Sequence, residues 1–228
     1  MQWDEFSEWG AKISQWAADY HTTLRERTVR AQTEPGDVAA LIAPSAPEGP
    51  HAMTEIMEDF ERVVMPGITH WQHPRFFAYF PANAAPPSML AEMLVSTIAA
   101  QCMLWQTSPA ATEMETVMLD WLRQAIGLPN KFSGVIQDTA SSATLVAVLT
   151  MRERALKWNG NQAGLSGAAR LRIYCSEEVH TSVDRAIWVA GIGQENLVRI
   201  PISGKLRSMN PQLLKEAIQS DIAAGHCP

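Results

Sequence analysis

The chain has 228 residues, of which 46% are hydrophobic and 18% charged, a balance typical of a folded globular protein. Its formal charge of -6 and pI near 5.5 argue against nucleic acid or an anionic membrane surface as the partner. The first residues lack the basic and apolar regions of a signal peptide. The three cysteines have no metal-ligand spacing, so we expect a reduced, cytoplasmic protein without a metal site.

The N-terminal region has the pattern of an amphipathic helix. Its apolar residues recur at spacings of three and four, namely Phe6, Trp9, Ile13, Trp16 and Tyr20. This apolar seam needs a partner surface, which is either the rest of its own domain or a second subunit. A proline and a glycine at 35–36 end the pattern. A second helix is expected from Thr54 to Val64, where Pro66 and Gly67 follow.

A segment from Trp71 to Pro81 is dense in aromatic residues and has no clear period. Aromatic side chains in such a segment either fill a core or line a ligand pocket. The residues alone favour the core, because core aromatics greatly outnumber ligand contacts. His70 and His73 flank this segment, but they lack a third ligand, which disfavours a metal site.

Two further helices are expected before the sheet region begins. Pro86 opens one that is apolar nearly all round and carries Glu92, so we expect a buried helix and not a membrane span. Ser108 and Pro109 open the other, with serine as N-cap and proline at the first helical position. Its inner face is expected to consist of Met114, Val117, Met118, Trp121 and Leu122.

Strands and helices then alternate, which predicts a parallel sheet with crossover helices. Strands are expected at 135–136, 171–175 and 197–200, with helices after 139, from 181 to 190 and from Asn210-Pro211 onward. The chain stops where another strand is due, so this α/β domain is expected to be incomplete. We therefore expect an all-helical segment over residues 1–85 and the first part of an α/β large domain over 86–228.

Two features of the α/β region point to chemistry. The turn Thr139-Ala140-Ser141-Ser142 joins a strand to a helix, where free N–H groups and hydroxyls make a phosphate site. Simple N-capping by serine or threonine explains the turn equally simply and is the commoner case. His180 follows a strand end, where it can act as acid or base or stack on a planar cofactor. A histidine that caps the next helix or lies at the surface is the alternative.

Read together, these segments resemble the aromatic-L-amino-acid decarboxylase family, the group II pyridoxal-phosphate-dependent decarboxylases. The resemblance covers essentially the whole chain as the N-terminal half of such a protein. It is carried by Trp71-x-His73-Pro74-x-Phe76-Phe77-Ala78-Tyr79-Phe80-Pro81, by Ser108-Pro109-Ala110-x-Thr112-Glu113-x-Glu115, by Gly134-Val135-Ile136-Gln137-x-x-Ala140-Ser141-x-Ala143-Thr144-Leu145 and by His180-x-Ser182-Val183-x-Arg185-Ala186.

The resemblance implies a fold-type-I, aspartate-aminotransferase-like large domain and the cofactor pyridoxal 5'-phosphate. It implies that Thr139, Ala140 and Ser141 hold the cofactor phosphate. It implies that His180 stacks on the pyridine ring and helps to supply a proton after carbon dioxide leaves. The implied pocket for an aromatic substrate is formed by Trp71, Tyr79, Phe80, Pro81, Gln101 and Met103. The N-terminal helices would pack on the second copy in a homodimer.

Three departures limit what this chain can do by itself. Asp138 stands where the family often has glycine before the phosphate turn, and Ala82 where a hydroxyl residue is common. None of the lysines lies in the family's His-Lys context, namely Lys12, Lys131, Lys157, Lys205 and Lys215. We therefore expect activity only together with the missing C-terminal half, in one chain or as a second chain. Two alternatives stay open, an aldehyde synthase of the same family and a non-catalytic dimerisation fragment, and the aromatic substrate is not fixed.

Overall fold

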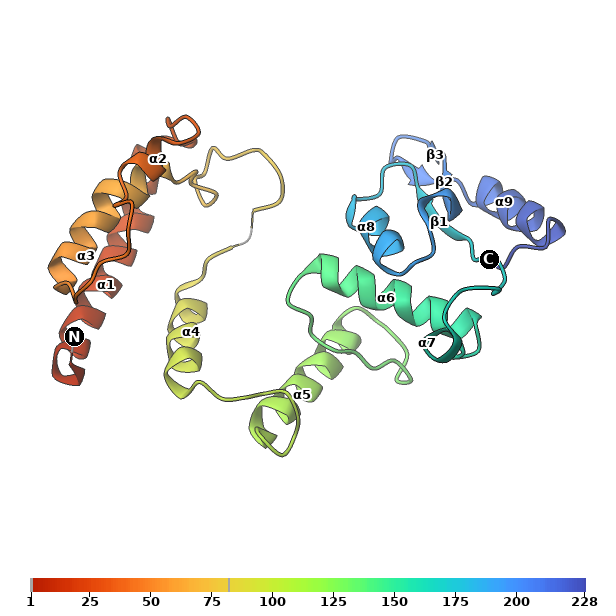
Figure 1. Ribbon diagram of the computed structural model, residues 1–228, viewed down its shortest axis with the longest axis horizontal. Helices are drawn as coiled ribbons and strands as arrows, with labels where there is room; N and C mark the ends of the chain where they lie inside the picture. The colour runs from red at the N-terminus through yellow and green to blue at the C-terminus, as the bar shows by residue number, and fades with distance from the viewer. Residues whose placement is uncertain (1, 82) are drawn as a thin grey trace. The chain divides into compact units, whose positions relative to one another are not determined.

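The computed structural model describes residues 2–81 and 83–228, so Ala82 lies outside the described residues (Figure 1). The chain forms two compact units, Met1–Ala99 and Ala100–Pro228. The contacts therefore group the helix that begins at Pro86 with the N-terminal unit, whereas the sequence-based boundary after residue 85 groups it with the second. None of the described helices is long and apolar enough to cross a membrane.

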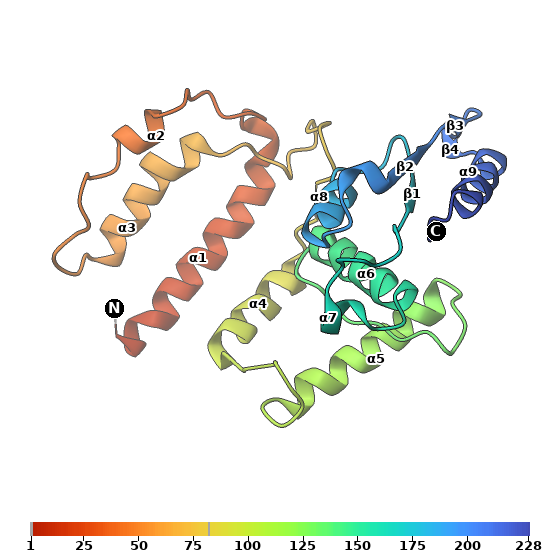
Figure 2. The same cartoon turned by 45° about the vertical axis from the view of Figure 1, so that its right-hand side comes forward.

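The N-terminal unit consists of helices and their connections. It contains α1 (Trp3–Thr23), a 3-10 turn (Leu24–Glu26), α2 (Asp37–Ala40), α3 (Met53–Asp59), a π-helical turn (Phe60–Val64), a second 3-10 turn (Met65–Gly67) and α4 (Pro86–Ile98). The first two predicted helices are confirmed, although the second changes to π geometry before Pro66. Figure 2 shows α1 and α3 running side by side. Trp16 of α1 makes an edge-to-face contact with Phe60 of the π-helical turn that continues α3, at 5.2 Å between ring centroids.

The apolar seam of α1 packs on its own unit at one end. Trp16 stacks on Tyr20 and also donates a hydrogen bond from Nε1 to Glu61 of the π-helical turn. At the other end Trp3 is 85% exposed and Ile13 is half-exposed. The first of the two alternatives therefore holds for Trp16 and Tyr20, while packing on a second subunit stays a prediction for the residues nearer the N-terminus.

The expected burial of two helices is wrong for this chain. On α4, Leu90, Leu94, Val95 and Ile98 are each at least 60% exposed. On α5 (Pro109–Ala125) the expected inner face is exposed to 47% or more at Met114, Val117, Met118, Trp121 and Leu122. The bounds of both helices follow the prolines, but Ser108 makes no side-chain capping bond. An all-apolar or amphipathic pattern indicates that a helix needs a cover, but it does not say which chain supplies that cover.

The second unit is an α/β arrangement around a short parallel pair. β1 (Ile173–Ser176) pairs with β2 (Leu197–Ile200) in the register Ile173 opposite Leu197. A 3-10 turn (Gln194–Asn196) precedes β2, and the small hairpin of β3 (Ile202–Ser203) and β4 (Ser208–Met209) follows it. The helices are α6 (Ala140–Ala155), α7 (Gly160–Ala163), α8 (Ser182–Val189) and α9 (Pro211–Ala223). The predicted strand at 197–200 and the Asn210 cap of α9 are confirmed.

The predicted strand at 135–136 is wrong. Val135 and Ile136 are 59% and 63% exposed and have no strand partner within residues 2–81 and 83–228. The N–H of Ile136 instead donates to Glu115 Oε1 at 2.8 Å. A strand forms only when its N–H and C=O groups hydrogen-bond to a neighbouring strand. Two apolar residues in a row do not provide such a neighbour.

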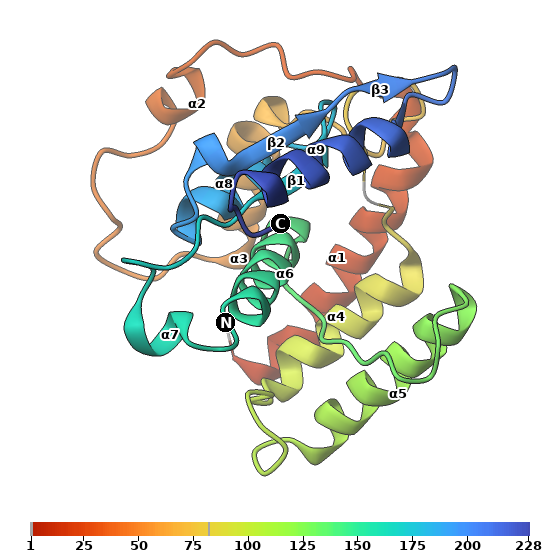
Figure 3. The same ribbon diagram turned by 90° about the vertical axis from the view of Figure 1, so that its right-hand side faces the viewer.

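Helices lie on both sides of the parallel pair, with α8 and α9 on opposite sides in Figures 1 and 3. On one side Val148 of α6 and Ile187 of α8 form a core against Ile173 and Leu197. On the other side Tyr174 donates from its hydroxyl to Asp221 of α9 at 2.6 Å. Alternate residues of β1 thus face opposite layers, as the strand period requires. This layering holds the loops at the ends of the strands and the starts of α6 and α8 in fixed positions.

Candidate active site

The turn before α6 has the geometry of a capped helix start. Thr139 is the N-cap in an extended conformation, and its Oγ1 accepts a hydrogen bond from the N–H of Ser142 at 3.1 Å. The N-capping alternative is therefore confirmed. It is compatible with a phosphate site, because first-turn N–H groups such as those of Ala140 and Ser141 have no intrahelical acceptors. The turn thus offers N–H groups, hydroxyls and the positive end of a helix dipole, a donor set that fits a phosphate.

Asp138 shares this turn and opposes an incoming anion. The Ser142 side chain, and after it the backbone N–H of Thr139, hydrogen-bond the Asp138 carboxylate and hold its pKa below the ordinary value. The group is therefore ionised at neutral pH beside the helix start. The unusual aspartate is visible in the sequence, whereas its hydrogen bond with the Ser142 side chain depends on the conformation of the turn.

If the cofactor phosphate binds at this helix start, we expect Asp138→Asn to tighten cofactor binding several-fold, because the substitution removes a like charge from beside it. The gain should shrink in high salt, since exposed charges are screened. Titration of the apo form of the complete protein with pyridoxal phosphate, followed by absorbance, measures the effect. Asp120→Asn on α5 is the matched control and should leave the affinity unchanged. Weaker binding by the Asp138→Asn protein would show that this carboxylate supports the site.

His180 lies in the loop between β1 and α8, with its side chain exposed. Its Nδ1 accepts a hydrogen bond from the backbone N–H of Ser182 at 3.1 Å, and its carbonyl accepts one from Val183 at 3.1 Å. His180 thus lies at the surface and bonds the first N–H of α8 from the position before the N-cap Thr181, which agrees with the alternative of a surface histidine at the helix start. The ring is held at Nδ1 by this bond. This bond could not be found from the sequence, because it depends on the loop conformation.

The start of α8 is anchored by a buried carboxylate. Asp184 is 8% exposed and accepts hydrogen bonds from Arg199 Nη2 of β2 at 2.6 Å and from Gln194 Nε2 at 3.2 Å. Ser182 is buried at the same helix start. The backbone that holds His180 is thus fixed to the neighbouring strand, and Asp184 and Arg199 are functional candidates that sequence analysis missed.

The aromatic segment belongs to the N-terminal unit. Trp71 stacks on Phe76 and on Tyr79, with ring centroids 5.0 Å and 5.4 Å apart. Phe80 is 99% exposed, and Tyr79 is 82% exposed with a φ of 56°. The preference for a core role is therefore wrong for Tyr79 and Phe80. Gln101 and Met103, the other expected pocket residues, are exposed in the second unit.

The two histidines beside this segment are buried structural groups. His70 Nδ1 is hydrogen-bonded to the Tyr20 hydroxyl at 2.8 Å, and the His70 N–H donates to Val29 at 2.9 Å. His73 Nδ1 accepts from the N–H of Arg75 at 3.0 Å. Within residues 2–81 and 83–228 no group of three or more His, Cys, Asp or Glu is placed to hold a metal ion.

Protonation of His70 should destabilise the N-terminal unit. Burial, then the positive charge of Arg27, then His73 lower its pKa from the ordinary value, while Tyr20 is bonded to it and Glu61 lines the same hollow. The unfolded chain therefore binds the proton more tightly. The stabilising contribution is complete above about pH 6.5 and is lost as the pH falls through the lowered pKa.

Urea denaturation followed by tryptophan fluorescence, from about pH 7.5 down to about pH 5.5, measures this loss. A flatter pH dependence is expected for His70→Gln than for the exposed control His51→Gln. Equal slopes for the two variants would contradict the assignment to His70.

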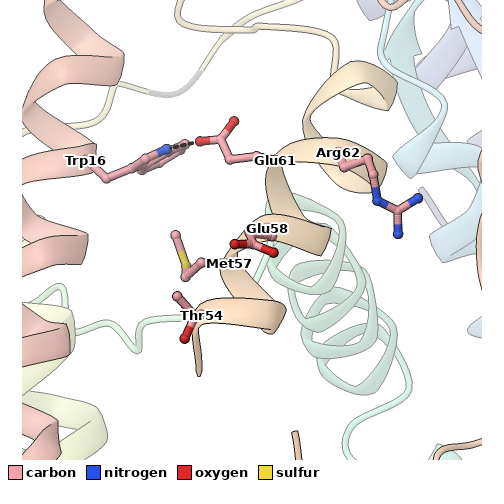
Figure 4. A pocket seen from close by; sticks show the side chains of 6 residues that line it. All are labelled: Trp16, Thr54, Met57, Glu58, Glu61 and Arg62. Atoms are coloured by element: carbon pink, nitrogen blue, oxygen red, sulfur yellow. Dashed lines mark hydrogen bonds between the residues drawn. The ribbon is translucent and has the colours of Figure 1, made fainter. Parts of the chain in front are cut away.

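A hollow of about 600 Å³ in the N-terminal unit lies between α1 and the helix that follows Ala52 (Figure 4). It is lined by Trp16, Thr54, Met57, Glu58, Glu61 and Arg62. None of the predicted cofactor or substrate residues borders it. The hollow therefore does not contribute to the candidate active site.

Residues 35–228 match the family model described as the pyridoxal-dependent decarboxylase conserved domain. The chain belongs to this family. An aromatic-L-amino-acid decarboxylase of Sus scrofa is 39% identical over 100% of this chain and 49% of its own length. The chain thus spans about half the length of the curated relatives it matches. Family membership confirms the resemblance and the cofactor, pyridoxal phosphate.

Solved structures of the decarboxylase family confirm the fold class. A Catharanthus roseus tryptophan decarboxylase in complex with L-tryptophan gives a TM-score of 0.91 at 33% identity, covering 99% of this chain and 48% of that chain. A Rhodiola rosea 4-hydroxyphenylacetaldehyde synthase gives 0.91 at 31% identity, covering 100% of this chain and 50% of that chain. The first part of a fold-type-I large domain, as expected from the sequence, is thus present, and a decarboxylase and an aldehyde synthase are among the similar structures.

Proposed function

We propose that the complete protein carrying this chain decarboxylates an aromatic L-amino acid to the amine and carbon dioxide with pyridoxal phosphate. The observation that carries the proposal is the set of hydrogen-bond donors at the start of α6. Thr139 caps this helix, and its first-turn N–H groups have no acceptor within the helix. Thr139, Ala140 and Ser141 would bind the cofactor phosphate there. The bound cofactor supplies the chemistry, because its ring withdraws the electrons of the broken bond.

The other residues of this chain would orient and enclose the substrate. His180 would lie against the face of the ring and help to hold the scissile bond perpendicular to it. Trp71, Tyr79, Phe80 and Pro81, with Gln101 and Met103, would form the pocket wall. Their exposed rings support this role, because large exposed aromatics at one segment indicate a binding surface. The lysine that binds the cofactor covalently would come from outside residues 1–228.

A homodimer follows from the same reasoning. Trp3 and the apolar residues of α4 are exposed and need a surface to pack on. The helical segment 1–85 of a second copy, together with the remainder of the protein, would provide this surface. Three free cysteines, one of them buried, support a reduced cytoplasmic location.

Expression of the complete protein tests the proposal. We expect visible absorbance from bound cofactor, and release of carbon dioxide from tryptophan, tyrosine, phenylalanine or dihydroxyphenylalanine. Residues 1–228 alone should bind no cofactor covalently and should release no carbon dioxide. Carbon dioxide release by residues 1–228 unaided would refute the need for the remainder, and a complete protein that binds no cofactor would be a non-catalytic assembly.

An aldehyde synthase is the second candidate, favoured by the likeness to the Rhodiola rosea 4-hydroxyphenylacetaldehyde synthase. Such an enzyme oxidises the amine as it decarboxylates. Measuring peroxide and ammonia beside carbon dioxide separates the two activities. Equal amounts of all three products identify the synthase, and carbon dioxide without peroxide identifies the decarboxylase.

A further inference from the structure

A second hollow of the N-terminal unit is lined by side chains of opposite charge. It measures about 300 Å³, at the lower end of the range for small-molecule sites. The polar part of its wall is formed by Arg27, Thr28, Glu61 and His70. None of the residues expected to bind cofactor or substrate lines it. The proposed function therefore gives this hollow no role.

Arg27 supplies the positive charge of the hollow. Within residues 2–81 and 83–228 its half-buried side chain makes no ion pair and no hydrogen bond, and its Nε is buried without an acceptor. The guanidinium lies over the ring of Tyr20, with Cζ 5.1 Å from the ring centroid. A buried donor without an acceptor costs free energy, and a planar guanidinium suits a carboxylate better than any other side chain does. Arg27 therefore has the chemistry of a carboxylate site.

Glu61 supplies the negative charge. Its Oε1 accepts a hydrogen bond from Trp16 Nε1 (Figure 4), whereas its Oε2 has no partner among the residues that the structure describes. No ion pair joins Glu61 to Arg27 in that part of the chain. His70 adds no charge at neutral pH, because burial and then the charge of Arg27 lower its pKa. The wall thus presents one positive and one negative group that do not neutralise each other by direct contact.

The rest of the wall is apolar and is formed by Met65, Pro66 and Ile68. We propose that this hollow binds a free α-amino acid with an aliphatic side chain, as the zwitterion. Arg27 and Thr28 bind its carboxylate, and Glu61 binds its ammonium group. The apolar residues contact its side chain. The site goes beyond the proposed function, because it needs neither the cofactor nor turnover.

Calorimetric titration of the complete protein with L-leucine tests the site. Leucinamide lacks the carboxylate and 4-methylpentanoate lacks the ammonium group, so each compound tests one end of the zwitterion. We expect each to bind about tenfold more weakly than leucine, the loss typical of a hydrogen bond to a charged group. An analogue that binds as well as leucine would overturn the proposal, and so would the absence of leucine binding at about 10 mM.

The cofactor distinguishes this site from the candidate active site. We expect leucine to bind with the same affinity before and after removal of pyridoxal phosphate from the complete protein. Leucine binding that requires the cofactor would place the ligand at the active site and overturn the proposal. A complete protein that binds leucine in this way but decarboxylates no amino acid would count against the proposed function alone.

Variants that neutralise one charge at a time locate the ligand. Arg27→Gln and Glu61→Gln should each weaken leucine binding about tenfold, and glutamine at position 61 keeps an acceptor for Trp16. In Arg27→Gln, leucine should also lose its advantage over leucinamide.

The matched controls are Arg30→Gln and Glu58→Gln, because both residues are exposed and neither lines this hollow. Both controls should keep the wild-type affinity for leucine. Unchanged affinity in Arg27→Gln or in Glu61→Gln would overturn the proposal. If these variants do not fold, the comparison of leucine with its two analogues on the wild-type protein still decides.

Discussion

Replacing His180 with alanine is expected to lower kcat of the complete enzyme about a hundredfold. The substitution removes the ring that would lie against the cofactor and help to hold the scissile bond perpendicular to it. Misorientation of the reacting bond accounts for the loss, because small displacements from the productive geometry cost about a hundredfold in rate.

The loss should appear in kcat with cofactor content nearly unchanged. The proposed phosphate donors at Thr139 and Ser141 lie at the start of α6, whereas His180 lies before α8. Cofactor absorbance per subunit and initial rates over a range of substrate concentrations measure the two effects separately. The exposed His51→Ala is the control and should keep normal rates. Turnover within a factor of two of wild type in His180→Ala would remove this residue from the mechanism.

The sequence predicts local structure well wherever one residue type determines the backbone. Asn210 caps α9 and Pro211 begins it, and the 197–200 strand has the predicted bounds. The proline at position 109 likewise begins α5. These features depend on the chemistry of one or two neighbouring residues, which any reader of the sequence has available.

Predictions failed where the answer depends on residues far away in the sequence. Ile136 has strand-like chemistry but bonds to Glu115. Leu94 of α4 has core chemistry but is 63% exposed. In both cases the local pattern shows that the segment suits a strand or a core. Whether a neighbouring strand or a covering surface is present depends on residues outside that segment.

The candidate site follows the same division. The turn at 139–142 could be predicted because serine and threonine favour helix starts, and the position of His180 because it follows the end of the strand β1. The hydrogen bond from Ser182 to His180 and the one between Ser142 and Asp138 could not be predicted. Each depends on a loop conformation, and at His180 the following helix is tied to β2 by the Asp184–Arg199 pair.

Glu153→Ala is expected to destabilise the second unit by about 3 kcal/mol, the typical loss when one partner of a buried ion pair is removed. Glu153 is 4% exposed, and its Oε1 accepts from Arg152 Nη2 at 2.8 Å. Its Oε2 accepts from the N–H of Asn161 at 3.1 Å. Arg152 in turn donates to the carbonyl of Ala190 at 2.8 Å, so the network joins α6, α7 and the end of α8.

Urea denaturation of wild type and variant at equal cofactor concentration measures the loss, since bound ligand stabilises the folded state. The control is Glu216→Ala on the exposed side of α9, which should change the free energy of unfolding by less than about 0.5 kcal/mol. A similar small change for Glu153→Ala would show that the network contributes little.

Gly160 provides a test of the geometry itself. A Cβ at this position would lie 2.4 Å from Glu153 Oε1, closer than any real contact, and 3.0 Å from Leu156 Cδ1. Gly160→Ala should therefore be strongly destabilising in the wild type and much less so in the Glu153→Ala background. Contacting residues give such non-additive free energies, and independent residues do not. Additive effects of the two substitutions would mean that the Glu153 carboxylate does not lie against α7.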